Sequence, residues 1–361
     1  MDLLAITLSQ PKGLWQSIIF GMENALGNYA LALILVTIII KFVMVPFDFV
    51  NKYTSKKSSR KQAEMKPDLD KINAKYADDK NMLNQKTMEV YKQHNFNIMG
   101  TCLGMLAYMI CTMVVFWTLF GALNGISAYK IGDQFLQVRS EYYSAYGVNV
   151  SELTEDQDAY EVYKSALSSM TEEQKTAALA DANGKALKKY DETKTSFLWI
   201  ENIWLPDNTT KPVMKYKDFI DKSVLTEDDI SEEEYTLIMT NIREEQRSNN
   251  GYFVLALLAA GVNFLSTFIN GLISKHKAIK KGVDPKLMSS SSNKSMMIIM
   301  PIIMGVFTLF YNAAFGLYIV SGAIIALITG PLVTLFVDML ELDAIKKQED
   351  KTIAKYDRRR K

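Results

Sequence analysis

Residues 29–47, YALALILVTIIIKFVMVPF, limit the possible folds of this chain more than any other stretch. They form an almost wholly apolar run that is long enough to cross a bilayer as a helix. One charge, Lys41, interrupts the run. An ammonium group at the centre of a span costs roughly 2.5–3.5 kcal/mol on insertion scales, so such a residue is a candidate for function. The alternative is a structural lysine. Lys41 lies roughly 9 Å of helix rise before Phe47, and its long stem could carry the charge toward the headgroups.

Four further apolar runs follow, and the five together predict an all-α, polytopic membrane protein. The predicted spans are about residues 29–47, 101–123, 252–273, 296–312 and 316–337.

The charges are strongly segregated along the chain, although the net charge is only +1. Residues 51–97 carry 11 Lys and Arg against 6 Asp and Glu, and residues 274–295 carry six Lys and one Asp. The segment 125–250 is the reverse, with 24 acidic and 14 basic residues. Basic loops stay in the cytoplasm, so the N-terminus and the acidic segment are expected outside and the basic C-terminal tail inside.

Two soluble parts are expected to be helical. Residues 51–76 and 79–94 have helix-compatible spacing and predict an antiparallel cytoplasmic hairpin, with a solvated linker as the alternative. In the acidic insert, Thr171 begins a TEEQ capping box and Thr226 is a second plausible helix start. The pair Asn183-Gly184 is the clearest turn signal there. The expected division is 1–28 interfacial amphipathic segment, 29–48 first span, 49–98 hairpin, 99–124 second span, 125–250 insert, 251–274 third span, 275–295 basic loop, 296–337 fourth and fifth spans, and 338–361 basic tail.

Two polar residues of the third span, Asn263 and Asn270, are seven positions apart and therefore share one face. Hydrogen bonding between helices explains them as well as contact with a substrate does. No catalytic or metal-binding motif is found: the chain has only two histidines, and it lacks both H-E-x-x-H and G-x-S-x-G.

Several separated stretches resemble the YidC/Oxa/Alb family of membrane protein insertases. They are Glu64 to Asn97 (EMKPDLDKINAKYADDKNMLNQKTMEVYKQHNFN), the following Gly100, Cys102, Leu103, Met105 and Leu106, the outer segment FLWIENIWLPD (Phe197 to Asp207), MMIIMPIIMGVF (Met296 to Phe307) and YIVS (Tyr318 to Ser321). The sequence departs from the family at Gly104 and Ile110, where prolines are common, and Lys41 replaces the usual arginine.

The resemblance implies five spans around a hydrophilic groove that is open to the cytoplasm and the lipid. It places Lys41, Thr37, Tyr318 and Asn270 in that groove, and Asn263 is added from its shared face with Asn270. It also implies a protein that inserts nascent membrane proteins into the bacterial plasma membrane, with no enzyme activity and no cofactor. The Sec translocon, the ribosome and anionic lipid are its candidate partners, and DNA is not one. The alternative from another class is an ion or solute transporter that uses Lys41 as an anion or coupling site.

Overall fold

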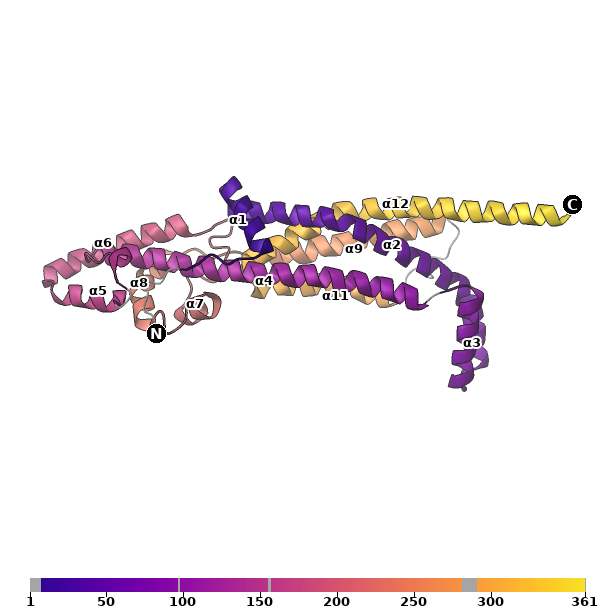
Figure 1. The fold of residues 1–361 in the computed structure, drawn as a ribbon, viewed down its shortest axis with the longest axis horizontal. Coiled ribbons are helices and arrows are strands. Elements are labelled where there is room, and N and C mark those ends of the chain that lie inside the picture. The colour runs from indigo at the N-terminus through magenta and orange to yellow at the C-terminus, as the bar shows by residue number, and fades with distance from the viewer. Residues whose placement is uncertain (1–7, 97, 155–156, 281–290, 361) are drawn as a thin grey trace. The chain divides into compact units, whose positions relative to one another are not determined.

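Helices account for nearly all the regular structure in this computed structural model, which describes residues 8–96, 98–154, 157–280 and 291–360 (Figure 1). The helices are α1 (Leu14–Leu26), α2 (Tyr29–Lys75), α3 (Lys80–Gln93), α4 (Ile98–Ser144), the 3-10 turn η1 (Val150–Glu152), α5 (Ala159–Ser168), α6 (Glu172–Thr193), α7 (Tyr216–Lys222), α8 (Glu232–Glu245), α9 (Val254–Lys280), α11 (Ser291–Phe310) and α12 (Ala313–Arg360). Within the described residues no strand forms beyond one isolated bridge, between Phe197 and Ile200. The predicted all-α class is confirmed.

Four of the described helices are long and apolar enough to cross a membrane. These stretches are Tyr29–Gln62, Leu106–Ser144, Val254–Ile273 and Ala313–Leu340. The apolar part of α11 that the structure describes, Ile298–Phe310, is shorter. The polytopic prediction is therefore confirmed, and the number five stays a prediction. Residues 1–7 of the predicted interfacial segment and 281–290 of the predicted basic loop lie outside the described residues.

The chain divides into two compact units. Unit 1 contains Met1–Val36, Thr118–Leu258 and Gly305–Ile319, and unit 2 contains Thr37–Trp117, Ala259–Met304 and Val320–Lys361.

In unit 1, the insert packs around the C-terminal part of α4, which continues as a helix beyond residue 124. Its core includes a buried ion pair in which Arg139 Nε lies 2.6 Å from a carboxylate oxygen of Glu234. The hydroxyl of Tyr143 donates to the same oxygen at 2.6 Å. Because both charges are paired and hydrogen-bonded, the insert can bury them at acceptable cost.

The capping box predicted at Thr171 is confirmed, with both reciprocal hydrogen bonds to Gln174 formed. Two other predictions for the insert are wrong. Asn183-Gly184 lies inside α6, because the helix buries Ala182 and Ala186 on one face and this burial overrides the local turn signal. Thr226 begins a turn closed by hydrogen bonds to Asp229, and the next helix starts after Ser231.

In unit 2, α2 runs without interruption through Pro46 and Pro67 to Lys75. The chain then reverses, and the carboxylate of Asp79 caps α3 by accepting from the backbone N–H groups of Asn81 and Met82. His94 Nε2 lies 3.3 Å from Asp68, which joins α2 to the end of α3.

Candidate functional site

Lys41 lies on α2 with its side chain against Gly322 of α12, both in unit 2. A Cβ atom built on Gly322 would be 2.9 Å from Lys41 Cε and 3.6 Å from Nζ. Gly322 is buried and Lys41 is partly buried. Among the residues that the structure describes, none forms a hydrogen bond or ion pair with this ammonium group. The glycine therefore provides the space that the lysine stem occupies.

Thr37 lies one turn before Lys41 on the same face of α2, and the structure brings the two together. Its side chain is only 1% exposed. Its methyl group would be 3.8 Å from a Cβ atom on Gly322. Both α2 residues of the predicted groove thus contact the same position of α12.

Three turns further along the same face, Lys52 joins α2 to α12 again. Its ammonium donates to the carbonyl of Gly330 at 2.8 Å and to the hydroxyl of Thr334 at 3.3 Å. Asn270 of α9 lies at the same point: its Nδ2 would be 3.4 Å from a Cβ atom on Gly330. The Oδ1 atom of Asn270 is buried and has no hydrogen-bond partner within the described part of the chain. Asn270 is therefore an unsatisfied acceptor beside a cation.

One turn beyond Lys52, Lys56 forms an ion pair with Asp338 of α12. The Asp338 side chain is 7% exposed and that of Lys56 is 23% exposed. Nearer Lys41, Asp48 accepts a hydrogen bond from Tyr108 of α4. The described part of α2 thus presents Lys41, Asp48, Lys52 and Lys56 on one face.

Sequence reasoning missed Lys52, Lys56 and Asp338. The signal was present in the spacing, because positions 41, 52 and 56 are 11 and then 4 residues apart and share a helical face. The charged residues beyond 48 instead predict a separate hairpin, and this hides the shared face.

The two other predicted groove residues make contacts of their own, and their place in the groove stays a prediction. Asn263 Nδ2 donates to the carbonyl of Ala259 on its own helix at 2.7 Å. Tyr318 belongs to unit 1, where its ring centroid is 6.0 Å from that of Phe315.

The α2–α3 hairpin carries a titratable contact of its own. The hydrogen bond from His94, and then that from Lys71, hold the pKa of Asp68 below its usual value. Lys61 donates to the carbonyl of Asn95 at 2.7 Å. The described residues contain no group of three His, Cys, Asp or Glu side chains placed to hold a metal ion. Beside the carboxylates of Asp48 and Asp338, the cluster on α2, α9 and α12 offers cations and one amide, which bind carboxylates and peptide groups.

Comparison with known proteins identifies the family. The family model described as "60Kd inner membrane protein" matches residues 21–337. The chain belongs to this family. It is accordingly a multi-pass bacterial membrane protein.

Three curated relatives of this chain carry the name "Membrane protein insertase YidC". The protein from Fusobacterium nucleatum is 39% identical over 102 residues, which are 28% of this chain and 46% of that protein. The protein from Methylobacillus flagellatus is 32% identical over 127 residues (35% and 22%), and that from Geobacter sulfurreducens is 34% identical over 101 residues (28% and 18%). The chain thus spans less than half the length of these relatives. No solved structure matches it.

Proposed function

We propose that this chain is a membrane protein insertase. It moves hydrophilic segments of nascent membrane proteins through a charged groove and releases their hydrophobic helices into the bilayer. Membership of the family and the printed names of the relatives support the activity. The observation that carries the mechanism is Lys41, a cation in an apolar span that lies against Gly322 and forms no ion pair with a carboxylate among the described residues.

Lys41 attracts the carboxylates of a passing hydrophilic segment. In hydrocarbon, each unsatisfied polar group of that segment costs several kcal/mol, so a polar path that reaches partway across the membrane lowers the barrier. The attraction at Lys41 is stronger than in bulk water because the local dielectric is lower.

Lys52 and Asn270 extend the polar path three turns along α2. Thr37, Asn263 and Tyr318 complete the predicted lining of the groove. Burial of the substrate's apolar helix in lipid provides the driving force, so the step needs no nucleotide, metal or other cofactor and no enzymatic chemistry.

The arrangement of unit 1 supports five spans. Leu255 at the start of α9 donates its N–H to Asp207, and Ala313 at the start of α12 donates to the carbonyl of Leu205 at 2.8 Å. Both helices therefore begin at one membrane surface. Since α9 crosses to the other surface, α11 must bring the chain back, and its 20 residues make a helix roughly 30 Å long.

The charge bias supports an orientation for these five spans. The N-terminus and the acidic insert lie outside, and the basic hairpin and tail lie in the cytoplasm of a bacterium. Nascent membrane proteins are the substrates. The Sec translocon, the ribosome and anionic lipid are partners that the basic cytoplasmic segments could contact.

The transporter alternative finds no support in the comparisons, whose relatives are named insertases. A flux assay in proteoliposomes separates the two functions, because an insertase passes no solute in the absence of a substrate protein.

The deciding experiment compares Lys41→Ala and Lys41→Arg with the parent protein in reconstituted liposomes. The substrates are one membrane protein with an acidic translocated tail and its variant with a neutral tail. We expect Lys41→Ala to insert the acidic-tailed substrate poorly and Lys41→Arg to retain most activity. Equal insertion by all three proteins would remove the electrostatic step.

A further inference from the structure

A tight turn in unit 1 presents an apolar side chain to the surroundings. Leu198 is 77% exposed, more than any other large hydrophobic side chain in the described part of the chain. Trp199 follows it. The residues after the turn are the opposite, since Ile200 is 1% exposed and Ile203 is fully buried.

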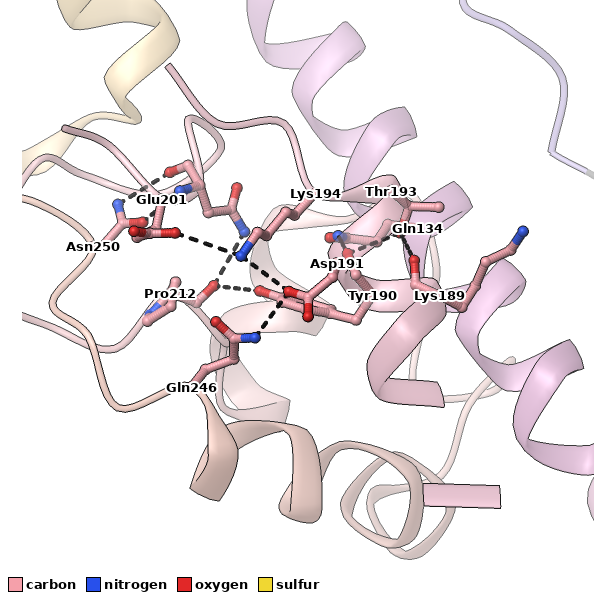
Figure 2. Close-up of polar contacts among 11 residues, drawn as sticks. Gln134, Lys189, Tyr190, Asp191, Thr193, Lys194, Glu201, Pro212, Gln246 and Asn250 are labelled. Atoms are coloured by element: carbon pink, nitrogen blue, oxygen red, sulfur yellow. Dashed lines mark hydrogen bonds and ion pairs between the residues drawn. The ribbon is translucent and has the colours of Figure 1, made fainter. Parts of the chain in front are cut away.

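The turn is fastened at several points, so the exposure of Leu198 is not a consequence of a loose loop. Phe197 and Ile200 exchange two backbone hydrogen bonds of 2.9 and 3.0 Å across it. An ion pair of 3.5 Å between Lys194 and Glu201 closes the loop around the turn (Figure 2). Leu198 itself has φ +54°, a conformation that is unfavourable for a residue with a side chain and persists only where the surroundings enforce it.

The segment that follows is tied to the first residues of three candidate spans. Trp204 packs its ring 4.8 Å from that of Tyr29, the first residue of α2. Asp207 accepts the N–H of Leu255 on α9 at 2.6 Å. The carbonyl of Ile203 accepts the N–H of Ala314 on α12 at 3.0 Å. The segment that follows the turn therefore lies where these helices begin, and such helix ends border an interfacial layer of roughly 5–7 Å on each side of a bilayer.

A second pair of exposed side chains, Tyr252 and Phe253, is linked to the turn by a hydrogen bond. Tyr252 is 56% and Phe253 is 40% exposed, and Phe253 is also held at a positive φ of +62°. Phe253 directly precedes α9. Asn250 joins this pair to the turn, because its carbonyl accepts the N–H of Glu201 at 3.1 Å. Of the two side chains, tyrosine is the one that favours the membrane interface, because its ring is amphipathic.

We propose that the Leu198–Trp199 turn is a lipid anchor that inserts into the interfacial layer of the leaflet at this end of the spans. Its occupant is phospholipid, at the boundary between headgroups and acyl chains. Through Trp204, Asp207 and Ile203, the anchor fixes the depth at which α2, α9 and α12 begin. This role is separate from insertase activity and is tested without a substrate.

The test uses full-length protein in liposomes in which Trp199 is the single tryptophan. The other tryptophans are removed by Trp15→Phe, Trp117→Phe and Trp204→Phe. Lipids brominated near the glycerol end of the acyl chain are expected to quench its fluorescence strongly, and aqueous acrylamide weakly. The matched control is Leu179→Trp with Trp199→Phe. Leu179 is 44% exposed in the middle of α6, and we expect its tryptophan to respond only to acrylamide. Quenching of Trp199 by acrylamide without a bromine effect would overturn the proposal.

A second measurement leaves the tryptophans in place. A nitroxide attached at Leu198→Cys, with Cys102→Ser and Cys111→Ser, is compared with one at Leu179→Cys. We expect the label at 198 to be relaxed more by oxygen than by a water-soluble nickel chelate, and the label at 179 to show the reverse. The same nickel accessibility at both positions, which is the outcome if water covers the turn, contradicts a lipid anchor. Protection of the label at 198 from both oxygen and nickel, which is the outcome if protein covers the turn, contradicts it as well.

Discussion

Substituting Gly322 with alanine tests whether the position of the Lys41 charge matters. The new Cβ would be 2.9 Å from Lys41 Cε, against an ordinary carbon–carbon separation of about 3.5–4.0 Å. The stem must therefore move by at least about 0.6 Å, and the ammonium at its end moves further. Because the stem is flexible, and alanine favours a helix over glycine by about 0.5–1 kcal/mol, we expect protein stability to change by less than about 1 kcal/mol.

The effect on insertion is larger than the effect on stability. At an effective dielectric constant of about 20, a charge pair is worth about 4 kcal/mol at 4 Å and about 2.8 kcal/mol at 6 Å. A displacement of about 2 Å thus removes about 1.4 kcal/mol, which is about tenfold in rate. We expect Gly322→Ala to slow insertion of an acidic-tailed substrate by up to about tenfold and to leave a neutral-tailed substrate unaffected.

The matched control is Gly261→Ala on α9, where an added Cβ meets nothing within 4 Å. The effect of Gly322→Ala is then measured again in proteins that also carry Lys41→Ala. There the glycine substitution should have no further effect, because the charge is gone. An equal loss in that background, or with the neutral substrate, would refute the electrostatic reasoning and leave only a packing effect.

Three further predictions follow from other contacts. Removing the Lys56 ammonium from its ion pair with Asp338, by Lys56→Met, should destabilise the protein in detergent by about 1.5–3 kcal/mol. The double variant Lys56→Met with Asp338→Leu should recover most of the loss, and equal thermal midpoints for the two variants would argue against a buried pair. Thr171→Ala should cost about 1 kcal/mol by removing the cap of α6, measured by thermal unfolding against Thr176→Ala as the control. The pKa of Asp68 is lower in the folded hairpin than in the unfolded chain. The ionised carboxylate therefore stabilises the hairpin fully at a pH above its unfolded pKa, and this stabilisation is lost as the pH falls through its folded pKa. Amide exchange of α3 should rise over that acidic range, and Asp68→Asn should abolish the pH dependence.

The sequence predicted the elements that depend on local chemistry. The apolar runs identify the four membrane-length helices that the structure describes, and the TEEQ pattern identifies the start of α6. The failures concern competition between local and distant interactions. Asn183-Gly184 has a strong turn signal, but Ala182, Ala186 and Tyr190 are buried on one face of a continuous helix. The burial of this helical face therefore decides the local structure against the turn signal of Asn183-Gly184.

Helix continuity was the other feature that local signals concealed. The predicted boundary at residue 124 lies inside α4, whose buried Ile131, Phe135, Val138 and Tyr142 continue a helical spacing. The charges after residue 48 similarly led to a separate hairpin, although α2 continues to Lys75. The site could be predicted only in part for this reason. Lys41 is conspicuous as a charge in an apolar run, whereas Lys52 becomes significant only once Gly330 and Asn270 are brought to it by α12 and α9.

Photo-crosslinking from positions 37, 41 and 318 to a stalled nascent chain tests the central claim most directly. With a photoreactive residue at position 37 and Lys41 intact, the account predicts crosslinks to the acidic hydrophilic segment of the substrate. These crosslinks should weaken when the segment's carboxylates are neutralised. Crosslinks to lipid alone from positions 37 and 41, or substrate crosslinks that do not change with the segment's charge, would contradict it.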